Sequence, residues 1–173
     1  MENKKIRIRR FDDKNVNEYK AVLASNCIPR EFDTLSKQKL ENGKNVFLMF
    51  REYVMKFMFF KNQTTELIGY AIVEDVNALP KDYKGYWHII YGVPENVLKK
   101  NPIVISDFMI SKINRRKGYG RKLAEHIIND VYCKKRISLE SVEDGVHFWH
   151  KFGFEYVNSN SSAMIIKDSK RKA

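Results

Sequence analysis

The pattern of hydrophobic and polar positions divides the N-terminal part of the chain into short alternating and helical segments. Residues 5–9 alternate isoleucine with basic residues, which predicts a half-buried strand. Asp12 and Asp13 precede a stretch with apolar residues three or four positions apart, so we expect them to cap a helix. A second helical segment follows Asp33, and Gly43 is its expected stop.

The middle of the chain contains two segments with the composition of strands. They are Tyr53–Phe60 and Leu67–Val73, and the polar stretch Asn62–Thr65 predicts the turn of a hairpin between them. Prolines and glycines then interrupt Val76–Pro102 and leave its structure open. Within it, Tyr86–Tyr91 could form another strand.

The C-terminal part alternates apolar runs with an amphipathic segment, which predicts a parallel crossover. We therefore expect an α/β protein in which a mixed sheet carries helices on its faces. The expected elements are a strand at Ile103–Ile110, a helix at Leu123–Tyr132, a strand at Arg136–Val142, a short helix at Gly145–Phe152, and a closing strand pair at Phe154–Asn158 and Ala163–Lys167.

A basic, glycine-containing loop lies between the 103–110 strand and the helix that follows it. Gly118 and Gly120 allow a tight turn and a close approach of the backbone to a ligand. The first amides of the following helix are unpaired and carry the positive end of the helix dipole. The loop therefore predicts a phosphate site, although glycines that merely shape a loop beside solvated charges are the alternative. Its residues are Arg115, Arg116, Lys117, Gly118, Tyr119, Gly120, Arg121 and Lys122.

Charge and length set the class of the protein. The 173 residues fit one domain, expected at residues 1–168, with a basic and disordered tail at 169–173. The formal net charge of +11 favours an anionic partner, which could be nucleic acid, a nucleotide cofactor or an acidic membrane surface. Charge alone does not choose among the three.

Segments for targeting or membrane insertion are not evident. The longest apolar-rich block, Val46–Phe60, is interrupted by charged residues and is too short to span a membrane. The charged N-terminus lacks the apolar core of a signal peptide. Cys27 and Cys133 have neither disulfide-framework nor zinc-site spacing, so we expect no metal and a reducing, cytoplasmic location.

Two motifs stand in a fixed order, separated by one predicted helix and one predicted strand. The first is Arg115-x-x-Gly118-x-Gly120, and the second is the FWHKFGF element at Phe148–Phe154. Together they resemble the GCN5-related N-acetyltransferase (GNAT) superfamily, and Asp107–Lys112 resembles the strand before the loop in one subgroup. The resemblance covers about residues 103–157. It implies a single domain with a mixed, mostly antiparallel central sheet flanked by helices.

The resemblance also implies a cofactor site. The loop from Arg115 to Lys122 would bind the pyrophosphate of acetyl-CoA, and Trp149 would contact the pantetheine arm. A backbone N–H near Phe108, Met109 or Ile110 would stabilise the oxyanion. The chain departs from the family where many members have a Tyr that protonates the leaving thiolate, because Trp149 occupies that position and has no acidic proton to give. Two further departures are Val142 and Gly145, where the family often has Asn and Ala.

The catalytic base is expected among acidic residues near the loop. Asp107 on the central strand is the first candidate and Glu140 on the next strand is the second, with a hydrogen-bonding or surface role as the alternative for each. His88 could line an acceptor pocket. The other histidines, His126, His147 and His150, are expected on helix surfaces or in packing.

The implied function is acetyl-CoA-dependent N-acetylation of a primary amine on a small molecule or a peptide. One alternative keeps this chemistry but acts on aminoacyl-tRNA, as some toxins of the superfamily do, and the positive charge would suit such a partner. Another is a non-catalytic protein that binds CoA or nucleic acid. The sequence leaves open the acceptor, the acyl chain length and whether the chain forms a homodimer.

Overall fold

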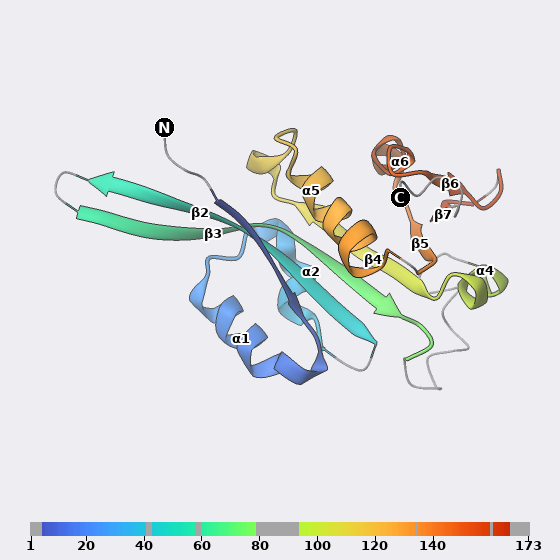
Figure 1. The fold of residues 1–173 in the computed structure, drawn as a ribbon, viewed down its shortest axis with the longest axis horizontal. Coiled ribbons are helices and arrows are strands. Elements are labelled where there is room, and N and C mark those ends of the chain that lie inside the picture. Colours follow the sequence, from blue (N-terminus) through green and yellow to red (C-terminus); the bar gives the residue numbers. More distant parts are fainter. Residues whose placement is uncertain are drawn as a thin grey trace.

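A single seven-stranded sheet forms the centre of the computed structural model, which describes residues 5–40, 43–57, 60–78, 94–133, 135–159 and 161–166 (Figure 1). Its strand order is β1-β2-β3-β4-β5-β7-β6. Strands β4 and β5 pair in parallel, and every other neighbouring pair is antiparallel. The expected mixed, mostly antiparallel sheet flanked by helices is therefore confirmed.

The strands are β1 (Lys5–Phe11), β2 (Lys44–Phe57), β3 (Phe60–Asp75), β4 (Ile103–Ile110), β5 (Ile137–Glu140), β6 (Phe154–Tyr156) and β7 (Ala163–Ile166). The α-helices are α1 (Val16–Ser25), α2 (Asp33–Lys37), α4 (Glu95–Lys100), α5 (Tyr119–Glu125) and α6 (Glu143–His150). Shorter 3-10 turns are η1 (Asp13–Asn15), η2 (Arg30–Phe32) and η4 (Lys112–Asn114), and α5 continues as the π-helical segment η5 (His126–Val131).

Two apolar clusters fill the space on the two faces of the sheet. Helices α1 and α2 cover one face, and α5, η5 and α6 cover the other (Figure 1). Tyr19, Phe32 and Leu35 pack with Tyr70 in the α1/α2 cluster. On the opposite face, the buried positions of α5 and η5 pack with Trp149 against the sheet, as the helical period of the sequence predicts.

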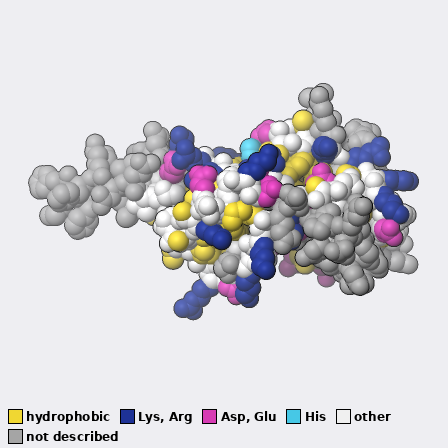
Figure 2. All heavy atoms as spheres, turned by 90° about the horizontal axis from the view of Figure 1, so that it is seen from below, with side chains coloured by type: hydrophobic (Ala, Val, Ile, Leu, Met, Phe, Trp, Pro, Cys, Tyr) yellow, Lys and Arg dark blue, Asp and Glu magenta, His cyan; other side chains and the backbone are white. Residues whose placement is uncertain are grey.

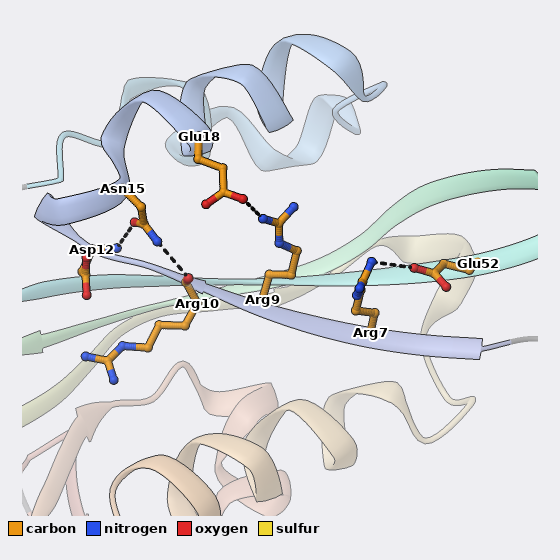
Figure 3. A network of polar contacts seen from close by, with 7 residues as sticks. All are labelled: Arg7, Arg9, Arg10, Asp12, Asn15, Glu18 and Glu52. Carbon is orange, nitrogen blue, oxygen red and sulfur yellow. Dashed lines mark hydrogen bonds and ion pairs between the residues drawn. The ribbon is translucent and has the colours of Figure 1, made fainter.

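Polar contacts fix the N-terminal helix on the first strand (Figure 3). Asp12 caps η1 by accepting a hydrogen bond from the backbone N–H of Lys14, and Asn15 Oδ1 accepts one from Asp12 N at 2.7 Å. Arg9 on β1 pairs with Glu18 on α1. The helix start expected at Asp12–Asp13 is thus confirmed, with a short 3-10 turn before α1.

The predicted turn of the central hairpin is wrong. Residues 62–65 lie inside β3 and pair with residues 52–55 of β2, and the two strands run to Phe57 and from Phe60. Strand β2 also begins at Lys44, nine positions before the expected Tyr53. The reason is that Val46–Phe50 is buried on both faces of the sheet, so it lacks the alternation by which half-buried strands are recognised.

Helix boundaries differ from expectation at three places. Helix α2 ends at Lys37, and Gly43 instead has φ +83° and accepts a hydrogen bond from Asp75 N at 2.6 Å. Helix α5 begins at Tyr119, so Gly120 belongs to its first turn rather than to the loop. Helix α4 was not expected. The strand predicted at residues 86–91, His88 and the tail at 169–173 lie outside the described residues.

The remaining predicted elements are confirmed within a few residues. Strand β4 has the expected bounds, and β1, β5, α6, β6 and β7 differ from their expected bounds by one or two residues at their ends. Within the part of the chain that the structure describes, no helix combines the length and the apolar character that crossing a membrane requires.

Candidate functional site

The two parallel strands at the centre of the sheet separate after three pairs of residues. Strand β4 pairs with β5 from Ile103 to Ile105, and beyond that point it pairs only with β3. A cavity of about 1140 Å³ opens where the strands separate. It is lined by Val104, Ile105, Ser106, Asp107, Phe108, Ile110, Arg115, Arg116, Gly118, Gly120, Arg121, Leu139, Glu140, Ser141, Val142, Gly145, Phe148, Trp149, Lys151 and Phe152.

A β-bulge marks the point of separation. The register between β3 and β4 shifts so that Ile72 faces Asp107 and Val73 faces Ile105, which leaves Ser106 as the extra residue. Its hydroxyl donates to Glu74 Oε1 at 2.8 Å. A bulge bends its strand and increases the local twist, so it accounts for the divergence of β4 from β5.

The backbone of β4 presents hydrogen-bonding groups to the cavity. Ser111 N donates to Ile68 O at 2.9 Å, on the β3 side. Because hydrogen-bonded and non-hydrogen-bonded pairs alternate along antiparallel strands, the N–H groups of Ile110 and Phe108 point away from β3, toward the edge that β5 leaves. The N–H of Met109 points toward β3. Two of the three backbone donors expected near the reacting centre therefore face the cavity.

The glycine loop closes one end of this cavity with a left-handed backbone. Arg116 has φ +59° and Gly118 has φ +82°. In the described part of the chain, nothing lies within 4 Å of where a Cβ on Gly118 would be, and Gly118 itself lines the cavity. Helix α5 starts at the next residue, so its unpaired first amides lie beside this open space. The resulting cradle suits a phosphate group.

Cationic side chains surround the cradle, and one of them is anchored. Arg115 Nε donates to Ile110 O at 3.0 Å, which ties the loop to the end of β4. Arg116 and Arg121 line the cavity and are exposed. Lys117 instead donates to Ile113 O at 2.6 Å, and Lys122 is exposed outside the cavity lining.

Aromatic rings from β4, α6 and the turn after α6 form one wall of the cavity. Phe108 of β4 lies 5.0 Å from Trp149 and 5.6 Å from Phe148, measured between ring centroids. Phe152 lies 5.1 Å from Phe148, and Phe154 packs behind Trp149 at 5.4 Å. Trp149 is buried and edge-on to three of its neighbours, a geometry that stabilises aromatic pairs. The wall is apolar.

The two candidate bases occupy different surroundings. Asp107 Oδ2 accepts a hydrogen bond of 2.5 Å from the hydroxyl of Tyr70, whose side chain is fully buried. Burial raises the pKa of Tyr70, and the neighbouring carboxylate of Asp107 raises that pKa further. Glu140 is exposed and accepts a hydrogen bond from Ser162 Oγ at 2.7 Å.

A polar network supports the loop from behind. Asn114 is completely buried and donates from Nδ2 to Glu66 Oε1 at 3.1 Å. Glu66 Oε2 also accepts from Arg51 Nε at 3.1 Å, and this bond raises the pKa of Arg51. An interaction in which the Arg51 guanidinium donates to the side-chain oxygen of Tyr119 raises the pKa of Arg51 as well. The base of the β2–β3 hairpin is thus connected to both ends of the loop.

The structure brings most of the sequence-predicted site residues together. Those that line the cavity are Asp107, Phe108, Ile110, Arg115, Arg116, Gly118, Gly120, Arg121, Glu140 and Trp149. Four others do not line it. Met109 packs against the α1/α2 cluster and Tyr119 against the opposite one, while Lys117 and Lys122 lie outside the lining.

Sequence reasoning missed part of the site. Ser106 and Ser141 line the cavity without having been singled out, and Phe148 and Lys151 were noted only as part of a motif. The spacing of Phe148 and Trp149 in α6 and Phe152 in the turn after it could have indicated an aromatic wall. Tyr70 gave no local signal, because its partner Asp107 is 37 residues away. His126 bonds Asp130, and His150 bonds Phe154 O, so both have structural roles.

Comparison with known proteins agrees with this geometry. Residues 86–167 match the family model described as Acetyltransferase (GNAT) domain. The crystal structure of Escherichia coli ElaA superposes with a TM-score of 0.50 at 15% sequence identity, over 94% of this chain and 100% of that chain. No curated protein matches the chain. The chain is therefore similar to GNAT acetyltransferases: the family model matches residues 86–167, and the likeness to ElaA shows that the fold is shared.

Proposed function

We propose that the chain is an acetyl-CoA-dependent N-acetyltransferase that acetylates a primary amine of a small molecule or a peptide. The observation that carries the proposal is the cavity between the diverging strands β4 and β5, closed at one end by the cationic glycine loop. A phosphate cradle joined to an apolar cleft fits a ligand with a pyrophosphate and a long uncharged arm. Acetyl-CoA has both parts.

Different residues around the cavity would contact different parts of acetyl-CoA. The amides at the start of α5, with Arg116 and Arg121, would hold the pyrophosphate, since the open space at Gly118 admits it. Phe148 and Trp149 would pack against the pantetheine arm. Acetyl-CoA supplies an activated acyl group as a thioester.

Asp107 is the proposed base. A lysine-type amine has a solution pKa of about 10.4, so a group in the site must remove its proton before it can attack. Asp107 lines the cavity and its carboxylate is held by Tyr70, whereas Glu140 is exposed and bonded to Ser162. Glu140 remains the second candidate. The N–H groups of Phe108 and Ile110 would stabilise the developing oxyanion.

The leaving group needs no acid in this site. A thiol has a pKa of about 8.5, so a thiolate can depart near neutral pH. Trp149, which occupies the position of the family's acidic Tyr, would then serve packing alone. A primary amine attacks, the C–S bond breaks, and the thiolate takes its proton from solvent.

Calorimetric titration with acetyl-CoA and with free CoA tests the proposal, followed by a screen of primary amines that includes aminoacyl-tRNA. We expect micromolar binding of both nucleotides and turnover of a small or peptide amine. Asp107→Asn should lower turnover, leave acetyl-CoA affinity unchanged, and recover rate at high pH, where the amine loses its proton unaided. Absence of nucleotide binding by folded protein would contradict the proposal.

Two alternatives give different results in the same assays. Turnover of aminoacyl-tRNA alone would favour an RNA acceptor, and CoA binding without turnover of any amine would favour a non-catalytic role. On the face shown in Figure 2, Lys and Arg side chains occur at separate places with acidic side chains among them. This distribution gives no support to a single RNA-binding surface on that face.

A further inference from the structure

Tyr70 is buried and does not line the cavity, but its hydroxyl bonds a residue that does. Its side chain has no exposed surface, yet its oxygen lies 2.5 Å from Oδ2 of Asp107, which does line the cavity. The two residues come from neighbouring strands and are offset by two residues in register, since Tyr70 faces Met109 and Ile72 faces Asp107. The contact thus crosses from β3 to β4 beside the bulge.

The position of the Tyr70 ring is fixed on the helical side. Phe32 of η2 meets it edge-on, with ring centroids 4.9 Å apart and planes at 77°. The side chain of Thr34 on α2 is also close to the Tyr70 hydroxyl, since it acts to lower the pKa of Tyr70. A ring held between two helical elements and a strand has little rotational freedom. Its hydroxyl therefore fixes the carboxylate, rather than the carboxylate fixing the hydroxyl.

We propose that Tyr70 is a positioning residue that holds the carboxylate of Asp107 for proton transfer from the acceptor amine. The inference rests on the proposed function, in which Asp107 is the base. The hydroxyl of Tyr70 donates to Oδ2 of Asp107, and among the described residues no hydrogen-bond partner is shown for Oδ1 of Asp107. The orientation of Oδ1 is thereby fixed, because rotation of the carboxyl group would break the bond between Oδ2 and Tyr70.

The proposed step transfers one acyl group and releases two protons from the acceptor. The ammonium form of the acceptor first gives one proton to Oδ1 of Asp107. The neutral nitrogen then forms its bond to the acyl carbon, and it releases its second proton to solvent as the C–S bond breaks. The thiolate leaves with its electron pair, and Asp107 returns the proton to solvent. The raised pKa of Tyr70 keeps its hydroxyl protonated, so it donates to Asp107 throughout the step.

A double-mutant cycle tests this role. Tyr70→Phe, Asp107→Asn and the double variant are compared at saturating acetyl-CoA, with the first amine that gives turnover in the screen. We expect Asp107→Asn to lower kcat about 100-fold and Tyr70→Phe about 10-fold, within the range for general-base catalysis. The double variant should match Asp107→Asn, because Tyr70 acts only through Asp107. Acetyl-CoA affinity should stay unchanged in all three.

Tyr19→Phe is the matched control. Tyr19 is buried in the same cluster, but its hydroxyl donates to Leu35 O at 2.9 Å. Tyr19→Phe removes a phenolic oxygen, as Tyr70→Phe does, but leaves the hydrogen bond of Asp107 intact. Its kcat should therefore remain at the wild-type value. If Tyr19→Phe lost as much kcat as Tyr70→Phe, the loss would come from altered packing of the cluster rather than from the contact with Asp107. That result would overturn the proposal.

A spectroscopic measurement is independent of activity. A short phenol–carboxylate bond gives a downfield hydroxyl proton resonance in NMR spectra, and we expect it to disappear in Tyr70→Phe and in Asp107→Asn but not in Tyr19→Phe. Multiplicative losses of kcat in the double variant would overturn the positioning role. Full activity of Asp107→Asn would overturn the base assignment instead, and the inference with it, even if acetyl-CoA still binds.

Discussion

Asn114 and Glu66 join two parts of the chain that are 48 residues apart. The Nδ2 atom of Asn114, a residue with no exposed surface, donates to Glu66 Oε1 at 3.1 Å and to Ser111 Oγ at 2.9 Å. Glu66 belongs to β3 just before its pairing with β4 begins at Gly69. The glycine loop is therefore braced by the base of the β2–β3 hairpin, and not only by the strand and helix on either side of it.

Glu66→Gln should weaken acetyl-CoA binding through this brace. The variant removes the negative charge that pairs with Arg51. It also replaces a carboxylate that accepts from both Arg51 and Asn114 with an amide that has only one acceptor oxygen. We expect about a 5-fold loss of acetyl-CoA affinity, in line with the 1 kcal/mol scale of a partly exposed ion pair. The affinity for acetyl-pantetheine, which lacks the pyrophosphate, should not change. Calorimetry measures both.

Glu52→Gln provides the control for that experiment. Glu52 lies on the same hairpin and pairs with Arg7 at 3.4 Å, away from the loop. It should bind acetyl-CoA as the wild type does. Equal losses for acetyl-CoA and acetyl-pantetheine in Glu66→Gln would show that the network stabilises the fold in general rather than the phosphate cradle.

Gly118→Asp should abolish acetyl-CoA binding, and Gly118→Asn separates the reasons. Asn and Asp both tolerate the left-handed conformation that φ +82° imposes, and they have nearly the same size. The difference between the two variants therefore reports the repulsion between a carboxylate and the phosphate. We expect Asn to weaken binding and Asp to remove it. Equal affinities in the two variants would indicate that no anion binds here.

Gly120→Ala tests the second glycine in the same assay. A Cβ at this position would lie 3.4 Å from the Phe148 ring, an ordinary contact, and the residue is already part of helix α5. Binding of acetyl-CoA should therefore be close to that of the wild type. A large loss would mean that the backbone at Gly120 approaches the ligand as closely as that at Gly118.

Sequence could predict the position of the glycine loop because its signals are local. Gly118, the cations around it and the helix that follows are neighbours in the chain, and β4 before them is a continuous apolar run. The divergence of β4 from β5 is not local. It depends on a bulge at Ser106, whose partner Glu74 is 32 residues away, and bulges carry no sequence pattern of their own here.

The long central hairpin shows the same limit. Val46–Phe50 reads as an undivided apolar run, so its strand character depends on cover from helices on both faces. The polar residues 62–65 have the composition of a turn. They stay in β3 because they pair with residues 52–55 of β2, which a local pattern does not reveal. Tyr70 and Glu66 were missed for the same reason: each gains its role from a partner on another element.

Gly69→Ala should destabilise the fold at the sheet beside the cavity. An added Cβ would lie 2.4 Å from Ile110 Cδ1 and 2.9 Å from the backbone oxygen of Met109, which cannot move without disturbing β4. We expect the free energy of unfolding to fall by about 1–3 kcal/mol, the usual cost of overpacking. Urea denaturation measures it, with Gly120→Ala as the variant that should change little. An unchanged unfolding midpoint would show that β4 is free to shift.

Tyr19 should make stability depend on pH in the alkaline range. Burial raises the pKa of Tyr19 to about 12 in the folded protein, from an ordinary value of 10.0. Between these two pH values the unfolded chain releases the proton and the folded protein keeps it, so the free energy of unfolding falls as pH rises. The contribution is complete below pH 10 and is lost toward pH 12. Its size is on the order of 2 kcal/mol.

Tyr19→Phe isolates that contribution. At neutral pH the variant should be about 1 kcal/mol less stable than the wild type, because the hydrogen bond to Leu35 O is lost. Above pH 10 the difference should shrink, since Phe has no proton to release on unfolding. Some alkaline slope remains in the variant, because Tyr70 and Tyr132 also have raised pKa values. Urea denaturation from pH 8 to 11.5 measures both proteins, and parallel stability curves would contradict the assignment of a raised pKa to Tyr19.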